Sequence, residues 1–207
     1  MLWVEQGQKL WSVPAGTQNK SCDSCHRDAA QSMKGAAARY PMVDPRSNKL
    51  LNIEGRINRC RVEHQGVTPL AYESQDLLAL TAYVTLQSRG IPRSVKVDGV
   101  AAPYFEVGRR FFVTREGQLN LSCAQCHDDN VGKKLRGDTI SQGQTLGWPG
   151  YRLEWQTMGS LHRRLRACSL GVRAEILDYG APEYLALELY LAWRSKELPL
   201  ESPAVRR

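Results

Sequence analysis

The chain has 207 residues, which is enough for one ordinary domain or for two small domains of about 100 residues each. Hydrophobic residues make up 42% and charged residues 24%, as in globular proteins, and no run of roughly 18 uncharged apolar residues is present, which excludes a membrane span. The 28 Lys and Arg residues outnumber the 21 Asp and Glu residues, and the net charge of +7 is compatible with nucleic acid, an acidic protein or a small anion as partner.

Almost all of the predicted elements are helices. The first, over 2–12, carries Glu5 and Lys9 where a signal peptide would be apolar, so we expect any export signal to have been removed or replaced. Apolar periodicity predicts further helices over 22–33, 73–88, 103–113, 123–130, 152–168 and 182–195. Strand patterning is nearly absent, so a mainly α fold is predicted.

The surroundings of two CxxCH motifs repeat along the chain. Gly7 and Gly108 each lie 15 residues before the first cysteine of their motif, CDSCH in one case and CAQCH in the other. Further on, Cys60 and Cys168 each follow an arginine by four residues and precede an apolar helical pattern. The Gly- and Pro-rich segment 88–103 is typical of a connector. We therefore predict two tandem helical modules of the cytochrome c type (class I-like), over 1–97 and 98–207.

Each CxxCH motif predicts one covalently bound haem c. Two thiols three positions apart on a helical turn reach the two vinyl groups of haem, and the adjacent histidine coordinates iron. The attachment thiols are Cys22, Cys25, Cys123 and Cys126, and the iron ligands are His26 and His127. A zinc ribbon needs its second CxxC about 15 to 20 residues away, and a thioredoxin motif needs a βαβ pattern, and neither context is present. Because haem is attached outside the bacterial cytoplasm, we expect a periplasmic protein.

The sixth ligand of each iron has several candidates. They are Met33, Met42, Cys60 and His64 in the first module and Met158, His162 and Cys168 in the second. Methionine is the usual ligand of an electron carrier, but only the two cysteines occupy matching positions. In an oxidising compartment Cys60 and Cys168 could instead form a disulfide, which would have to join equivalent points of two separate modules. Thiolate ligation of both irons, by Cys60 and Cys168, is favoured.

Arginines surround both of these cysteines. They are Arg56, Arg59 and Arg61 near Cys60, and Arg163, Arg164, Arg166 and Arg173 near Cys168. Positive charge stabilises a thiolate and attracts an anionic substrate. Any single arginine could equally pair with a haem propionate or a helix end, so the cluster is more informative than its members.

The chain resembles the SoxA family, the di-haem subunit of the bacterial thiosulfate-oxidising SoxAX cytochrome. The resemblance covers essentially the whole chain and rests on both haem motifs, on LWVEQGQKLW and on RLRACSLGVRAEILDYGAPEYLALELYLAWRSKELPLESPAVRR. It implies an L-cysteine S-thiosulfotransferase, which joins thiosulfate to a cysteine of the carrier SoxYZ and passes two electrons to haem. It also implies that the C-terminal haem is catalytic and that Cys168 can carry a persulfide. Arg164 matches the catalytic arginine best, and Arg194 is the second choice.

The resemblance further implies a heterodimer with SoxX, a small monohaem cytochrome c. CDSCH and Cys60 are both intact, which implies the form with two haems. Family members usually have more sequence before LWVEQG, so part of an N-terminal extension is expected to be missing. We expect neither a nucleic-acid partner nor a membrane span. Two alternative functions stay open: a thiosulfate dehydrogenase that forms tetrathionate, and a plain di-haem electron carrier with methionine or histidine ligands.

Overall fold

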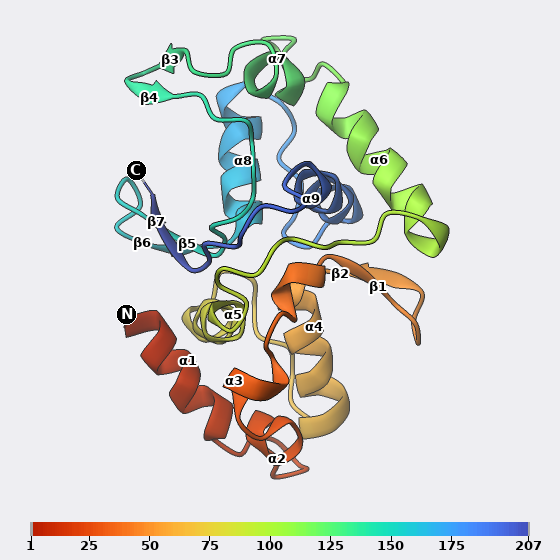
Figure 1. Ribbon diagram of the computed structural model, residues 1–207, viewed down its shortest axis with the longest axis vertical. Helices are drawn as coiled ribbons and strands as arrows, with labels where there is room; N and C mark the ends of the chain where they lie inside the picture. Colours follow the sequence, from red (N-terminus) through yellow and green to blue (C-terminus); the bar gives the residue numbers. More distant parts are fainter. Residues whose placement is uncertain (1, 207) are drawn as a thin grey trace.

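The computed structural model describes residues 2–206, which form a mainly helical protein (Figure 1). The helices are α1 Leu2–Ser12, α2 Cys22–His26, α3 Ala29–Ser32, α4 Ile53–Cys60, α5 Gln75–Leu86, α6 Ala102–Val113, α7 Cys123–His127, α8 Leu161–Gly171 and α9 Pro182–Arg194. The strands are β1 Met42–Asp44, β2 Lys49–Leu51, β3 Lys134–Leu135, β4 Asp138–Thr139, β5 Gly150–Arg152, β6 Thr157–Gly159 and β7 Ala204–Arg206. No helix within the described part of the chain is long and apolar enough to cross a membrane.

Most of the predicted helices are confirmed, with somewhat shorter bounds. The helix predicted over 22–33 is divided into α2 and α3, because Arg27 between them has a positive φ of 56°. The helix predicted over 152–168 is wrong in its first half, where β5 and β6 form a hairpin. There α8 begins only after its N-cap Ser160, whose hydroxyl accepts a hydrogen bond from the backbone N–H of Arg163.

Two features of the fold were missed from the sequence. One is α4, which begins at the N-cap Asn52 and is rich in charged residues, so its apolar face is narrow. The other is the set of short strands: β1 pairs with β2, β3 with β4, and β5 with both β6 and β7. Strands of two or three residues are too short to show the alternation by which strands are recognised.

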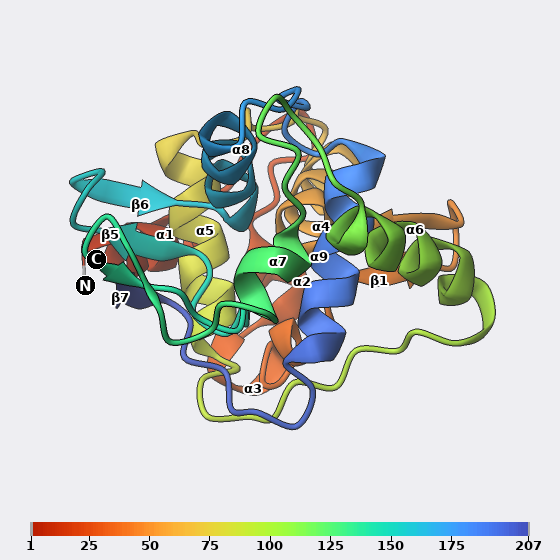
Figure 2. The ribbon, with the colours of Figure 1, turned by 90° about the horizontal axis from the view of Figure 1, so that it is seen from above.

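The core is organised around two crossed helix pairs. In the lower half of Figure 1, α1 packs on α5, and in the upper half α6 packs on α9. Side chains such as Leu77 and Leu80 of α5, and Leu187 and Leu189 of α9, are completely buried. The two halves also touch each other. The three-stranded sheet of β5, β6 and β7 lies on the same side of the molecule as α1 (Figures 1 and 2), and Met158 of β6 packs against the first turn of α1.

A glycine lets the backbones approach closely at each helix crossing. A Cβ atom added at Gly7 would lie 2.1 Å from the carbonyl oxygen of Ala79, and one added at Gly108 would lie 2.0 Å from that of Ala186. No rotamer change relieves such a contact, because both groups belong to the backbone. The two glycines that repeat before the CxxCH motifs are therefore required by packing.

We predict that Gly108→Ala lowers the free energy of unfolding by about 3 kcal/mol, at the upper end of the range for overpacking. Chemical denaturation followed by circular dichroism measures the change. Gly171→Ala is the matched control, because a Cβ atom there meets nothing within 4 Å, so this variant should be no less stable than the original chain. Equal losses in the two variants would contradict the explanation.

Candidate functional site

The first CxxCH motif forms one short helix, α2, and places three functional side chains on it. Its N-cap Ser21 forms a reciprocal capping box with Ser24. The indole of Trp11 lies against the imidazole of His26, with the ring centroids 5.7 Å apart, and donates a hydrogen bond from Nε1 to the carbonyl oxygen of Arg27. Partial burial lowers the pKa of His26, which favours the neutral imidazole, the form that binds iron.

The second motif forms α7 in the same way, with Ser122 and Gln125 as the capping box. His127 Nδ1 lies 2.7 Å from the carbonyl oxygen of Ser141, a distance at which the ring nitrogen donates to the carbonyl. The proton is then on Nδ1, and the lone pair of Nε2 is left for a metal. The donor set therefore fits a covalently attached haem whose iron is bound by His127.

Cys60 and Cys168 face the two motifs. Burial raises the pKa of Cys22 to about 11, and a smaller contribution comes from the neighbouring Cys60. Burial likewise raises the pKa of Cys123 to about 12, and Cys168 is the next cause. Each distal cysteine is thus close enough to its own motif to act on it electrostatically. All six cysteines are free, so the structure contains no disulfide between Cys60 and Cys168.

The other candidates for the sixth ligand are divided between the two halves. In the second half, Met158 is buried against α1 and α5, and His162 is buried with its Nδ1 accepting a hydrogen bond from the backbone N–H of Gly180. Both side chains are therefore engaged elsewhere. In the first half, Met42 and His64 line a pocket of about 220 Å³. Met33 is partly buried in the core around Trp11 and Cys22.

The arginines of the two halves have different partners. The guanidinium of Arg56 lies 3.3 Å from the carboxylate of Asp44, whereas no acidic side chain within residues 2–206 forms an ion pair with Arg164. Arg194 pairs with Asp128, directly after the second motif, and its guanidinium lies over the ring of Phe112. Of the other arginines near the two cysteines, Arg59 forms ion pairs with Asp44 and Glu63, and Arg163 forms one with Glu73. The remaining three donate hydrogen bonds: Arg61 to Gln65, Arg166 to the carbonyl oxygen of Leu177, and Arg173 to Gln118.

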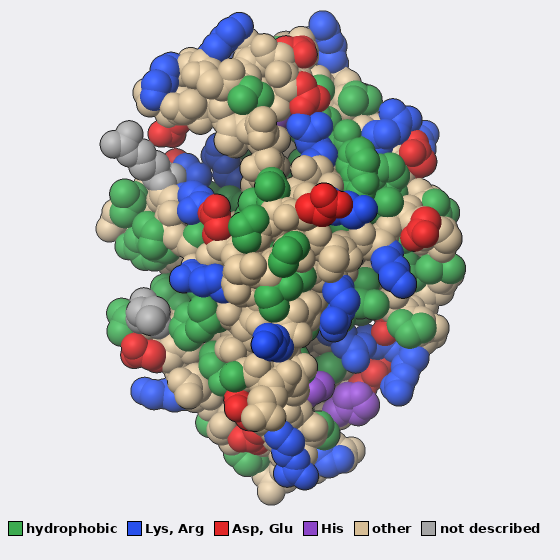
Figure 3. Space-filling view, in the orientation of Figure 1, with side chains coloured by type: hydrophobic (Ala, Val, Ile, Leu, Met, Phe, Trp, Pro, Cys, Tyr) green, Lys and Arg blue, Asp and Glu red, His purple; other side chains and the backbone are tan. Residues whose placement is uncertain are grey.

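Lys and Arg side chains are spread over the face of the molecule in Figure 3 and do not form one patch. Histidine side chains gather in the lower part of that face, beside basic side chains. Because that face has no single basic patch, the contacts of the individual arginines near each cysteine decide how much positive charge is available to a ligand.

A buried polar cluster between the two halves was not predicted from the sequence. Glu54 and Glu188 line a cavity of about 30 Å³, together with Arg93. Arg93 donates to the carbonyl oxygens of Tyr40 in the first half, at 2.8 Å, and Thr145 in the second, at 3.0 Å. The only sequence signal is an acidic residue, Glu188, inside the apolar pattern of α9.

Comparisons with known proteins cover the whole chain. A family model described as SoxA/TsdA, cytochrome c domain, matches residues 6–93. The L-cysteine S-thiosulfotransferase subunit SoxA of Pseudaminobacter salicylatoxidans is 44% identical over 208 residues, which cover 100% of this chain and 73% of that protein. The subunit of the same name from Paracoccus pantotrophus is 40% identical over 206 residues, 100% of this chain and 71% of that protein. The crystal structure of SoxXA from P. pantotrophus matches with a TM-score of 0.96 and 40% identity, over 100% of this chain and 78% of that one.

Proposed function

The chain belongs to the SoxA family of haem c-binding L-cysteine S-thiosulfotransferase subunits, and from this we propose that its second half performs the sulfur chemistry, with Cys168 and Arg164 as the catalytic residues. The observation that carries the proposal is the contrast between two arginines that each precede a distal cysteine by four residues. Arg56 is held by Asp44, and Arg164 has no acidic partner within the described chain. Residues four apart lie on one face of a helix, so Arg164 and Cys168 share a face of α8.

The proposal includes two tandem cytochrome c-type modules, over 1–97 and 98–207. It is supported by structural equivalences between the two halves. The hairpin β1–β2 spans 42–44 and 49–51, and the hairpin β5–β6 spans 150–152 and 157–159, each bound being 108 residues later. Ser88 Oγ accepts a hydrogen bond from the N–H of Ala37 at 3.0 Å, and Ser195 Oγ accepts one from Thr145 at 3.1 Å.

We propose two haem c groups, one in each module. The attachment thiols would be Cys22 and Cys25 in the first module and Cys123 and Cys126 in the second, and the iron ligands would be His26 with Cys60 and His127 with Cys168. When bound, haem c supplies the one-electron acceptor that the oxidative reaction requires. An intact mass equal to the chain plus two haems is the expected result, and a mass with one haem would contradict this part of the proposal.

The proposed reaction converts the carrier thiol and thiosulfate into a cysteine S-thiosulfonate, one proton and two electrons. The thiolate of Cys168 first forms a sulfur–sulfur bond with the sulfane sulfur of thiosulfate, and the two electrons released would pass one at a time to haem c. The carrier thiolate then attacks the sulfane sulfur, the new sulfur–sulfur bond forms, and Cys168 leaves as a thiolate. Arg164 attracts and orients the dianion, which would otherwise be repelled by the thiolate. In the same site, Cys168 is proposed to carry an extra sulfur as a persulfide.

The proposed partner is a SoxX-type monohaem cytochrome c, in a heterodimer, and the proposed second substrate is a SoxYZ-type carrier protein. The partner is supported by the solved relative, whose structure is of SoxXA. A periplasmic location follows from covalent haem attachment, because that attachment takes place after export.

Arg164→Gln tests the proposed function. With SoxX-type and SoxYZ-type partners present, we expect thiosulfate transfer to fall about 10²-fold, the usual loss when one charge-stabilising donor is removed. Arg56→Gln is the matched control, since it removes the equivalent arginine of the first module, and its transfer rate should stay near that of the original chain. Equal losses in both variants would contradict the assignment. Tetrathionate formed at the same rate without carrier would favour a thiosulfate dehydrogenase.

A further inference from the structure

The same position of the two halves carries opposite charges. Asp44 ends β1, and Arg152, which is 108 residues later, ends β5. Both side chains are buried, with residue exposures of 5% and 8%. Asp44 lies next to Arg56, the arginine that precedes Cys60 by four residues. In the second half, Arg152 and Arg164, the arginine that precedes Cys168 by four residues, both act electrostatically on Glu154. The inference below rests on the proposed function for the role of Arg164.

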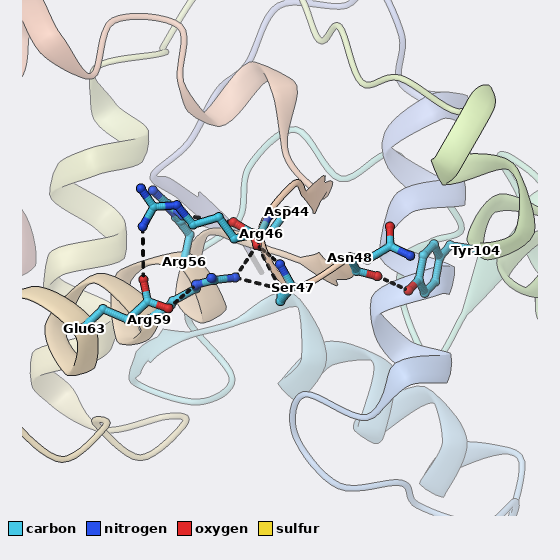
Figure 4. A network of polar contacts seen from close by, with 8 residues as sticks. All are labelled: Asp44, Arg46, Ser47, Asn48, Arg56, Arg59, Glu63 and Tyr104. Atoms are coloured by element: carbon cyan, nitrogen blue, oxygen red, sulfur yellow. Dashed lines mark hydrogen bonds and ion pairs between the residues drawn. The ribbon is translucent and has the colours of Figure 1, made fainter.

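Asp44 is the centre of the polar network in Figure 4. Its Oδ2 accepts hydrogen bonds from the backbone N–H groups of Arg46, at 3.0 Å, and Ser47, at 2.8 Å. Its Oδ1 lies 3.3 Å from the guanidinium of Arg56, and Arg59 also pairs with the carboxylate. The hydrogen bonds from Ser47, the N–H first, together with the charge of Arg59 and the N–H of Arg46, lower the pKa of Asp44 to about 2, so the carboxylate is charged at neutral pH.

Asp44 also forms part of the wall of the 220 Å³ pocket, together with Arg56 and His64. The pocket is on the side of the first motif, because His64 and Arg56 both act electrostatically on His26. An anion that entered this pocket would meet a carboxylate, and the two arginines of the wall already have acidic partners, Arg56 with Asp44 and Arg46 with Glu63.

The second half has the reverse arrangement. Arg152 pairs with Glu154 at 2.8 Å, and this glutamate is half exposed. Glu154 is influenced by Arg164 only at longer range, because the two side chains are not within ion-pair distance. No acidic side chain within residues 2–206 forms an ion pair with Arg164, so its guanidinium is available to a ligand.

We propose that Asp44 determines where the anionic substrate binds: by occupying Arg56 and placing a carboxylate in the pocket wall, it makes the first site reject thiosulfate and confines the sulfur chemistry to the second. Asp44 touches neither substrate nor haem in this role, so it is a positioning residue for Arg56. The first haem is thereby left to a function that needs no oxyanion.

Asp44→Asn tests this proposal while preserving the turn, because the amide oxygen of asparagine can still accept the N–H groups of Arg46 and Ser47. The measurement is thiosulfate binding to the haem-loaded heterodimer by isothermal titration calorimetry, with Arg164→Gln present in both samples so that only the first site contributes. We expect Asp44→Asn to tighten binding about tenfold or more, the value of one charge-assisted hydrogen bond. Adding Arg56→Gln should abolish the gain. Unchanged binding would overturn the proposal.

Glu106→Gln is the matched control, because it removes one carboxylate from an exposed ion pair, with Arg109 at 2.9 Å, that is not part of the pocket wall. It should not increase thiosulfate binding, and an increase equal to that of Asp44→Asn would overturn the specific role of Asp44. The outcome for Arg164→Gln alone tests the proposed function separately.

Discussion

Replacing Cys168 with alanine should reduce thiosulfate transfer to the carrier cysteine by at least about 10³-fold, because the variant lacks the sulfur that forms the first sulfur–sulfur bond. Cys168 faces the second CxxCH motif and shares a helix face with Arg164. The measurement is the rate of S-thiosulfonate formation on the carrier, followed by mass spectrometry. Electron paramagnetic resonance of the same variant should show the loss of one of two low-spin thiolate signals.

Cys60→Ala is the control for this prediction, because Cys60 has the same relation to the first motif. It should remove the other thiolate signal and leave most of the transfer activity, since Arg56 beside it is held by Asp44. Two methionine- or histidine-type signals that neither mutation changes would contradict thiolate ligation. That result would leave a plain electron carrier as the function.

The sequence predicted the parts of the site that depend on short spacing. Two thiols and a histidine within five residues are brought together by one helical turn, and the family resemblance that included them is confirmed by relatives matched over the whole chain. The position of each distal cysteine at the same place in a repeat was also visible before the structure. The prediction that Cys60 and Cys168 bind iron stays a prediction.

The charge reversal between Asp44 and Arg152 was not visible in the sequence. It depends on the hairpins β1–β2 and β5–β6, whose strands of three residues have no recognisable alternation. The second hairpin was included in a predicted helix. Without the hairpins, nothing in the sequence shows that Asp44 and Arg152 are buried at the ends of equivalent strands, or brings Asp44 to Arg56.

The buried acidic cluster between the halves was hidden for another reason. Glu54 lies at the start of α4, and Glu188 lies in α9, more than a hundred residues later. Asn52 Nδ2 donates to Glu188 Oε2 at 3.1 Å, and His162 Nε2 lies 3.2 Å from the same oxygen. Contacts of this separation depend on how the halves pack, which local patterns do not encode.

Burial and the nearby carboxylate of Glu188 raise the pKa of Glu54 from 4.5 to about 8. The folded chain therefore keeps a proton on Glu54 at a pH where the unfolded chain has released it. Linkage then requires that the free energy of unfolding decreases as the pH rises from about 4.5 to about 8, with no further change from this group above that range.

Glu54→Gln should remove this dependence, because glutamine has nearly the same shape and stays neutral at every pH. The variant should gain most over the original chain at pH 8 and least near pH 5, by several kcal/mol over the interval. Denaturant unfolding at a series of pH values measures the difference. Glu5→Gln, at an exposed position of α1, should leave the pH profile unchanged. Only a group whose pKa differs between the folded and unfolded chains makes the free energy of unfolding depend on pH. Parallel profiles for the original chain and Glu54→Gln would therefore mean that the proton is held elsewhere in the cluster.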